Sequence, residues 1–294
     1  MNSFLATIAR SLIYIIGLLP LPVARALGSG LGRLSWLAQD RGALTTTDNL
    51  RMCFPRMQDE EREALAKKSL RETYKIAGET FVVWQRGRAW CEKHTLESQG
   101  EELLRTPLAQ GKGVIVAMPH MGNWEFLGSH LARFAKATCM YQPPKKDYME
   151  NIVLNGRTSL DLTLVPTNRK GITAQLKALN AGELVAILPD QVPTQGGIYS
   201  PFFGLDAFTM TLIHGFVQRT GCKVVMGFAQ RFESGFKIFF IEPPAEIYSS
   251  DEQVSVSALN RGIEQCVAMC PEQYQWEYKR FKKRLGDGPD SYRA

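Results

Sequence analysis

The segment VIVAMPHMGNWEFLGSHLARF, residues 114–134, places two reactive side chains directly after an apolar run. His120 follows the stretch VIVAMP, and Glu125 comes five residues later. A carboxylate that is hydrogen-bonded to one imidazole nitrogen fixes the tautomer of the ring and leaves the other nitrogen as a base. On one continuous helix the two side chains would diverge by about 140°. They converge more readily if His120 lies in a turn between a strand and a helix that contains Glu125.

The residues around the pair favour such a turn. Pro119 and Gly122 bend the chain, Asn123 can cap a helix, and the stretch EFLGSHLARF has helical apolar spacing. The positive end of that helix would keep the imidazole neutral, and its backbone N–H groups would stabilise an oxyanion. A histidine that only caps the turn is the alternative interpretation.

Motifs of several other enzyme classes are absent from the sequence. It contains no G-x-S-x-G of an elbow serine hydrolase, no P-loop and no G-x-G-x-x-G after a strand. A His–carboxylate pair without a protein nucleophile indicates direct activation of a substrate hydroxyl group. The natural partner for an activated hydroxyl is an activated acyl group.

The elements that must position this pair alternate between strands and helices from about residue 106. Short β-branched runs are GVIVAM, TCMYQ, TLVPT, ELVAILP, CKVVMGFAQRF and FKIFFIEPP. Helical patterns lie between them, at about 125–136, 147–158, 171–181, 208–220 and 253–270, and an earlier helix begins near Gln58. This alternation predicts an α/β fold with a mainly parallel central sheet flanked by helices. Ligands bind beyond the carboxyl ends of such strands, where the sequence has His120 and Asp190.

The N-terminal region differs from the rest. Phe4–Leu19 is apolar except for Arg10 and a few small polar residues. Roughly 18 helical residues span ~27 Å, barely the core of a bilayer, and Arg10 near the middle would cost ~2.5–3.5 kcal/mol there. Residues 1–40 are therefore predicted to be a helical membrane anchor, with a secretory signal or a buried helix as alternatives. The basic residues that follow the apolar run place the body of the protein in the cytoplasm: Arg25, Arg33 and Arg41.

The composition narrows the functional classes. The chain has 294 residues, 45% of them hydrophobic, which excludes a disordered or multi-span membrane protein. A formal net charge of +6 suits an anionic partner such as a phospholipid headgroup, a phosphorylated substrate or an acidic carrier protein. No nucleic-acid-binding motif is present. The six scattered cysteines are typical of reduced cytosolic thiols, and no metal site is expected.

We divide the chain into the anchor, a helical region (41–105), an α/β domain (106–285) and a tail (286–294).

The sequence resembles a known family. PHMGNWE is similar to the H-x4-[DE] motif of the lysophospholipid acyltransferase superfamily, in the form found in bacterial lipid A late acyltransferases, the lauroyl and myristoyl transferases. DNLRMCFPRM, GELVAILPDQ, PFFG and PEQYQWEYKRFKKR resemble further family segments in the same order, so the similarity covers nearly the whole chain. The family commonly has Phe at the position of Met121, a mild difference at an apolar site.

The resemblance implies roles for individual residues. His120 is the expected general base and Glu125 its orienting partner. Substrate binding is assigned to Asn123, Arg157, Arg169 and Asp190, the two arginines facing the anionic substrate. Family members take acyl groups from acyl carrier protein, acylate phosphorylated glycolipids (lipid A precursors) and work on the cytoplasmic face of the inner membrane. They need no metal or organic cofactor.

Other functions remain open at this point. A lysophospholipid or a mannosylated phosphatidylinositol could replace the glycolipid as acceptor. The same pair could activate water, which would make the protein a thioesterase. A non-catalytic membrane-anchored lipid carrier is the third alternative. Nothing in the sequence specifies the length of the acyl chain or the acylated position.

Overall fold

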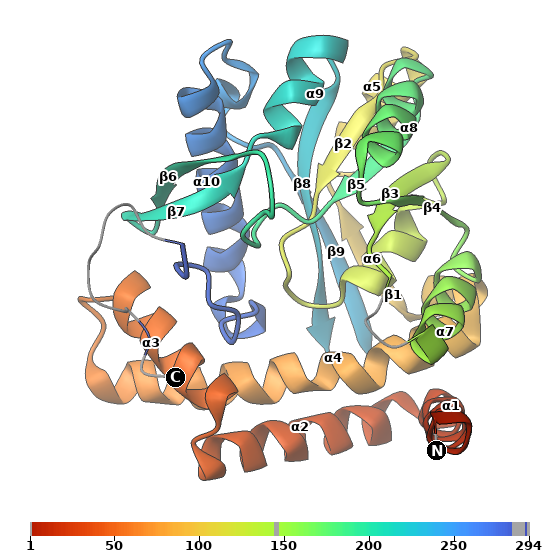
Figure 1. The fold of residues 1–294 in the computed structure, drawn as a ribbon, viewed down its shortest axis with the longest axis vertical. Coiled ribbons are helices and arrows are strands. Elements are labelled where there is room, and N and C mark those ends of the chain that lie inside the picture. Colours follow the sequence, from red (N-terminus) through yellow and green to blue (C-terminus); the bar gives the residue numbers. More distant parts are fainter. Residues whose placement is uncertain (1, 144–146, 284–291, 293–294) are drawn as a thin grey trace.

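A seven-stranded sheet forms the centre of the fold (Figure 1). The computed structural model describes residues 2–143, 147–283 and 292. Neighbouring strands are parallel except for one antiparallel pair, β8 and β9. The strands follow one another across the sheet in the order β1 (Thr95–Gln99), β9 (Gly235–Ile241), β8 (Lys223–Phe232), β2 (Val114–Ala117), β5 (Leu184–Ile187), β3 (Ala137–Tyr141) and β4 (Leu162–Pro166).

Helices cover both faces of this sheet, because the side chains of each strand alternate between two hydrophobic cores. Ile115 and Ala117 of β2 enter one core, which also receives residues from α8 (Arg169–Asn180), α9 (Leu212–Thr220) and α10 (Glu252–Met269). Val114 and Val116 enter the other core, with residues from α5 (Glu102–Ala109) and α6 (Trp124–Leu131). Near the second core, α7 (Asp147–Thr158) packs against β4. The predicted α/β class, with a mainly parallel sheet flanked by helices, is confirmed.

Four helices precede the sheet: α1 (Asn2–Leu18), α2 (Leu21–Ala38), α3 (Arg41–Cys53) and α4 (Asp59–His94). In Figure 1 α4 runs along the lower end of the sheet, and α2 lies below it. The two helices approach closely at Gly28, where a Cβ atom would lie 2.5 Å from the carbonyl oxygen of Tyr74. Gly87, with a φ of +68°, interrupts the helical geometry of α4.

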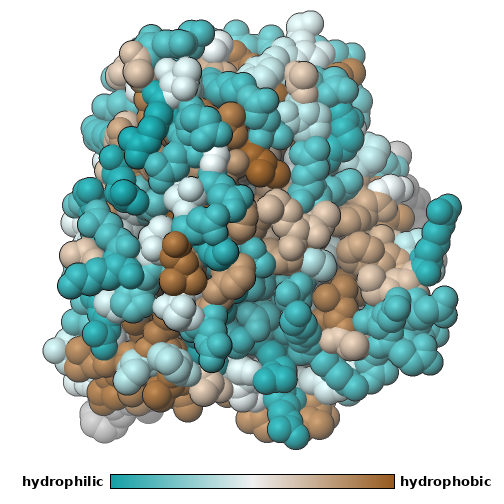
Figure 2. All heavy atoms as spheres, turned by 180° about the vertical axis from the view of Figure 1, so that it is seen from behind, coloured by the Kyte–Doolittle hydropathy of each residue, from teal (hydrophilic) through white to brown (hydrophobic). Residues whose placement is uncertain are grey.

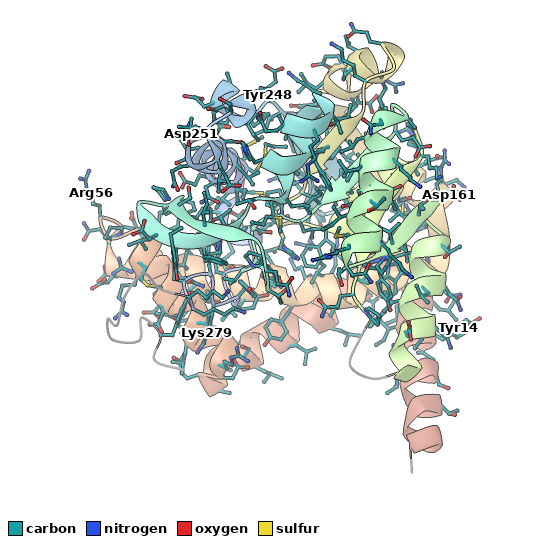
Figure 3. The ribbon with its side chains drawn as sticks, turned by 45° about the horizontal axis from the view of Figure 1, so that its top comes forward. Tyr14, Arg56, Asp161, Tyr248, Asp251 and Lys279 are labelled. Carbon is teal, nitrogen blue, oxygen red and sulfur yellow. The ribbon has the colours of Figure 1, made fainter. Side chains whose placement is uncertain are left out.

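The outer side of α1 and α2 is apolar. Figure 2 shows hydrophobic side chains gathered along the lower edge of the molecule, and Figure 3 shows α1 extending beyond the α/β body with Tyr14 on its surface. Among the described residues, no helix is both long enough and apolar enough to cross a bilayer. The expected membrane anchor stays a prediction. Among the described side chains of the two helices, the exposed large hydrophobic ones are Leu12, Tyr14, Ile15, Leu18, Val23, Leu27, Leu31, Leu34 and Leu37.

The structure differs from the sequence-based elements in three strands. The short strand β1 lies in the region 41–105 that we expected to be helical, and β6 (Gly197–Phe202) pairs with β7 (Leu205–Met210) in a separate hairpin. The helix expected from about residue 208 therefore begins only at Leu212. Short 3₁₀ turns at Ala245–Tyr248 and Pro271–Gln273 flank α10. All six cysteines are free, as predicted, and all six are buried. Apart from residue 292, the tail 286–294 falls outside the described residues.

Candidate active site

The turn between β2 and α6 carries the His120 motif. Asn123 caps α6, because its Oδ1 accepts a hydrogen bond from the backbone N–H of Phe126 at 2.9 Å. Gly122 has a φ of +56°, and a Cβ atom there would lie only 1.9 Å from the carbonyl oxygen of Ala229. A side chain at this position is therefore excluded. The strand–turn–helix arrangement that the sequence predicts is present.

Asp190 binds His120 through both of its carboxylate oxygens. Oδ1 lies 2.7 Å from Nδ1 of the ring, and Oδ2 accepts a hydrogen bond from the backbone N–H of His120 at 2.8 Å. The residues meet because each follows its strand at the carboxyl edge of the sheet, and β2 and β5 are parallel neighbours. The side chain of Asp190 is 2% exposed and that of His120 is 16% exposed. Solvent or substrate can therefore reach the imidazole, while its carboxylate partner is shielded.

The charge of Asp190 determines the tautomer of His120. Burial alone would raise the pKa of Asp190, but the charge of His120 and the hydrogen bonds that it donates hold this pKa below its ordinary value. An anionic carboxylate can only accept hydrogen bonds, so Nδ1 of the neutral imidazole carries the hydrogen and Nε2 keeps its lone pair. Nε2 is therefore the ring atom that can take a proton. The indole ring of Trp124 meets the imidazole edge to face, with 5.1 Å between the ring centres.

Glu125 has a different partner from the one that the sequence suggests. Its buried carboxylate accepts hydrogen bonds from Arg157, the shortest at 2.6 Å from Nη2, and one from Nε1 of Trp84 at 3.0 Å. In the described structure no hydrogen bond joins Glu125 to His120. Asp190, rather than Glu125, holds Nδ1 of the histidine.

Arg157 is a charged group at the edge of this site. Burial lowers the pKa of Arg157, but the charge of Glu125 and the hydrogen bonds to it outweigh burial and raise the pKa above its ordinary value. The side chain is 23% exposed, and its guanidinium carbon lies 5.9 Å from the centre of the Tyr141 ring. Nε and Nη2 serve Glu125, so Nη1 can still donate to an anionic ligand.

The other two predicted binding residues lie in contrasting surroundings. Asn123 is fully buried, and its Nδ2 donates to Oε2 of Glu79 at 3.1 Å, so both polar atoms of the side chain are engaged within the protein. Arg169 is exposed and begins α8, directly after β4 at the carboxyl edge of the sheet. It forms no ion pair with any described residue.

Residues 273–277 also contribute to the site, although no spacing or charge pattern in the sequence places them there. The backbone N–H of Gln275 donates to the carbonyl oxygen of His120, and that of Gly122 donates to the carbonyl oxygen of Gln273, both at 2.9 Å. In the same segment, burial raises the pKa of Glu277 to about 7. Its Oε2 has no hydrogen-bond partner among the described residues. The only sequence signal was the resemblance of PEQYQWEYKRFKKR to a family segment.

The site therefore combines a reachable base, a buried anion behind it and a cation at its edge. Within the described residues, no three His, Cys, Asp or Glu side chains are grouped as a metal site. This set suits removal of a proton from a neutral nucleophile that belongs to an anionic substrate.

Comparison with known proteins identifies the family. A model of the bacterial lipid A biosynthesis acyltransferases matches residues 2–283. The chain belongs to this family. The resemblance carried by PHMGNWE and the other segments is thereby confirmed.

Several family members are similar over most of their length. The lipid A biosynthesis lauroyltransferase of Escherichia coli K12 is 25% identical over 296 residues, covering 98% of this chain and 95% of the relative. The palmitoleoyltransferase of the same organism is 28% identical over 279 residues, covering 90% and 87%. A lipid A biosynthesis acyltransferase of Haemophilus influenzae is 24% identical over 280 residues, covering 90% and 86%.

Proposed function

We propose that this acyltransferase moves a fatty acyl chain from an acyl carrier protein thioester to a hydroxyl group of a phosphorylated glycolipid, a lipid A precursor. His120 is the general base. The hydrogen bond between its Nδ1 and Asp190 carries the proposal, because it leaves Nε2 unprotonated and exposed to substrate. Membership of the family supports the class of acceptor.

The reaction balances with His120 as the only proton carrier. Nε2 takes the proton of the acceptor hydroxyl as the oxygen attacks the carbonyl carbon of the thioester and a C–O bond forms. The C–S bond then breaks, and the leaving thiolate takes the proton back from the imidazolium. Asp190 stabilises the imidazolium between these steps, and backbone N–H groups in the first turn of α6 stabilise the oxyanion. The scheme uses neither a metal nor an organic cofactor.

The remaining polar residues hold the acceptor. In the proposal Glu125 supports the reaction indirectly, because its carboxylate fixes Arg157 at the edge of the site. Arg157 and Arg169 bind phosphate groups of the acceptor. Nη1 of Arg157 can donate to such a group, and the side chain of Arg169 is exposed. Asn123 maintains the substrate-facing first turn of α6.

The proposed location is the cytoplasmic face of the inner membrane. The exposed apolar side chains of α1 and α2 support it, because a helix with one apolar side lies in the plane of a membrane surface. A substrate with several acyl chains stays in the bilayer, so an enzyme seated on the surface meets it there. The donor, acyl carrier protein, approaches from the cytoplasm.

Product analysis with a labelled acyl group tests this function. The purified protein is mixed with labelled acyl-carrier-protein thioester and a lipid A precursor in mixed micelles, and we expect acylated precursor. Free fatty acid without acylated lipid would indicate a thioesterase, and the absence of any turnover would indicate a lipid carrier. A preference for lysophospholipid or mannosylated phosphatidylinositol would overturn the acceptor. His120→Ala should lose ~10²–10⁴-fold in turnover, the usual contribution of a general base.

A further inference from the structure

A buried charged cluster lies behind the turn that carries His120, which we call the catalytic turn. Apart from Asn123, which caps α6, its members take part in none of the steps above. It consists of Arg25, Glu79, Asn123 and Arg231, and we call it the Glu79 cluster. Glu79, on α4, accepts hydrogen bonds from Nε of Arg25 at 2.6 Å and from Nε and Nη2 of Arg231 at 2.6 and 2.8 Å. Nδ2 of Asn123 donates to it at 3.1 Å. Three side chains from distant parts of the chain thus converge on one carboxylate.

The cluster holds the turn that carries His120 at two points. Asn123 connects Glu79 to the first turn of α6, since its other end caps the helix. Nη2 of Arg231 donates to the carbonyl oxygen of Gly122 at 3.1 Å. Both contacts lie within three residues of His120, on the side of the turn that faces β8 rather than β5. Asp190 therefore fixes one end of the turn and Glu79 the other.

The cluster also reaches the outermost helix of the protein. Arg25 belongs to α2, whose opposite side carries the exposed leucines. Besides Glu79, its guanidinium binds the carbonyl oxygens of Phe232, Glu233 and Gly235 in the turn between β8 and β9. The buried carboxylate of Glu79 therefore contacts both Arg25, which holds α2 against the body of the protein, and Asn123, which belongs to the catalytic turn.

Only a carboxylate satisfies this arrangement. Burial would raise the pKa of Glu79, but the charges and hydrogen bonds of the two arginines hold it below its ordinary value, so the group is an anion. All four hydrogen bonds are donated to its two oxygens. An amide in its place has one oxygen, and its N–H groups would point at donors. Buried ion pairs contribute little net stability, so the main consequence of this one is the geometry that it imposes.

We propose that Glu79 is a positioning residue for His120 and that, together with Arg25, it links the seating of α2 to the alignment of the catalytic turn. The inference rests on the proposed role of His120 as general base. A displacement of about 1 Å at a catalytic group is sufficient for a ~10²-fold loss of rate, so the effect falls on kcat. Substrate binding depends on other contacts, and KM stays nearly unchanged.

A swap of the two interacting groups tests the proposal. Glu79→Gln turns an acceptor into a donor toward Asn123, and Asn123→Asp keeps the helix cap but places two carboxylates together. Each single substitution should lower kcat by about 10²-fold, with little change in KM for the thioester. In the double variant the new amide donates to the new carboxylate, and Nη2 of Arg231 keeps the carbonyl oxygen of Gly122 as its acceptor. The kcat should therefore recover in part, by at least ~10-fold, a coupling of about 1.4 kcal/mol. The full-length protein is assayed well below its unfolding midpoint.

Asn260→Ala is the matched control. Asn260 is buried on α10 and donates to the carbonyl oxygens of Ser200 and Pro201 in strand β6, and it belongs to none of the contacts of the Glu79 cluster. It should lose stability but keep kcat. If Glu79→Gln does not fold, Arg25→Lys replaces it, because lysine keeps the charge but cannot reproduce the several hydrogen bonds of the guanidinium. We expect this variant to lose about 10-fold in kcat and to bind vesicles normally.

Two outcomes separate this inference from the proposed function. If Glu79→Gln, or Arg25→Lys in its place, retains the kcat of the control while His120→Ala is inactive, the positioning role is wrong and the general base stands. If His120→Ala itself remains active, the proposed function is wrong. Recovery of the unfolding midpoint in the double variant without recovery of kcat would also overturn the positioning role.

Discussion

His120 and Asp190 are 70 residues apart in the chain, yet Nδ1 of the histidine lies 2.7 Å from the carboxylate. The parallel pairing of β2 with β5 brings them together. The carboxylate also accepts the backbone N–H of His120, so it fixes the position of the residue as well as the tautomer of the ring. A His–carboxylate pair therefore exists in this protein, but its carboxylate lies outside the H-x4-[DE] motif.

The first prediction concerns this carboxylate. Asp190→Asn keeps the size of the side chain but removes its charge, so the imidazolium is no longer stabilised and the wrong tautomer of His120 is favoured. We expect turnover to fall by about 10³–10⁴-fold, as in other sites where the orienting carboxylate is replaced by an amide. Transfer from labelled carrier thioester measures it, and Asp206→Asn, an exposed substitution on β7, is the control. Retention of more than a tenth of the activity would show that Asp190 does not orient the base.

The sequence was sufficient to find both residues of this pair but not to join them. Each follows an apolar strand and so falls at the edge where ligands bind in parallel sheets. Two further strands, β3 and β4, separate β2 from β5 in the chain, so the adjacency of β2 and β5 in the sheet cannot be read from their order. The ion pair between Glu125 and Arg157 could not be read from the sequence for a similar reason, because Arg157 lies on a helix 32 residues later.

The strands that the sequence did not reveal lack the apolar pattern of a buried strand. The edge strand β1 has the sequence TLESQ and leaves all of its side chains at least partly exposed. Pro201 lies inside β6, where proline removes a backbone donor and argues against a strand. Such strands form because the pairing partner and the packing of the whole domain override local preference.

The second prediction concerns Arg157. Its removal would leave the buried carboxylate of Glu125 without a charged partner and cost ~3–5 kcal/mol, so a folded variant requires a retained cation. Arg157→Lys keeps the positive charge but loses the paired hydrogen bonds that Nε and Nη2 of the guanidinium donate to Glu125. We expect the apparent KM for the phosphorylated acceptor to rise by about 10-fold and that for the thioester donor to stay the same. On a dephosphorylated acceptor the variant and the natural protein should be equal, and an equal loss on both acceptors would exclude a phosphate contact.

The third prediction concerns stability and pH. The pKa of Glu277 is about 7 in the folded protein and near 4.5 when unfolded. Below pH 4.5 Glu277 is protonated in both the folded and the unfolded state, so its titration does not change the free energy of unfolding. As the pH rises to 7, the unfolded state releases its proton first, and the native protein loses stability relative to Glu277→Gln. We expect this difference to grow by roughly 3 kcal/mol across that window and to remain constant above it.

Urea unfolding at several pH values measures the effect of Glu277→Gln. Glu233→Gln, at an exposed carboxylate, is the control and should show no such trend. A difference in unfolding free energy that is independent of pH would mean that Glu277 does not titrate between pH 4.5 and 7 in the folded state.

The last prediction concerns the proposed attachment of α2 to the membrane. Leu27 and Leu34 lie on the outer side of α2, with 55% and 61% of their surface exposed, and neither supports the fold from within. The pair Leu27→Glu and Leu34→Glu should therefore leave the unfolding midpoint unchanged while it introduces two charges into the apolar side. If this side enters the bilayer, the variant should move to the soluble fraction, since burial of each leucine contributes about 1.5–3 kcal/mol.

Val254→Glu, on the exposed surface of α10, is the control and should stay with the membranes. Sedimentation with membranes is measured in high salt, because salt removes purely electrostatic attachment and leaves attachment through apolar side chains. A double variant that still sediments would place the attachment elsewhere, and α1 with its exposed Leu12 and Ile15 would be the next segment to substitute.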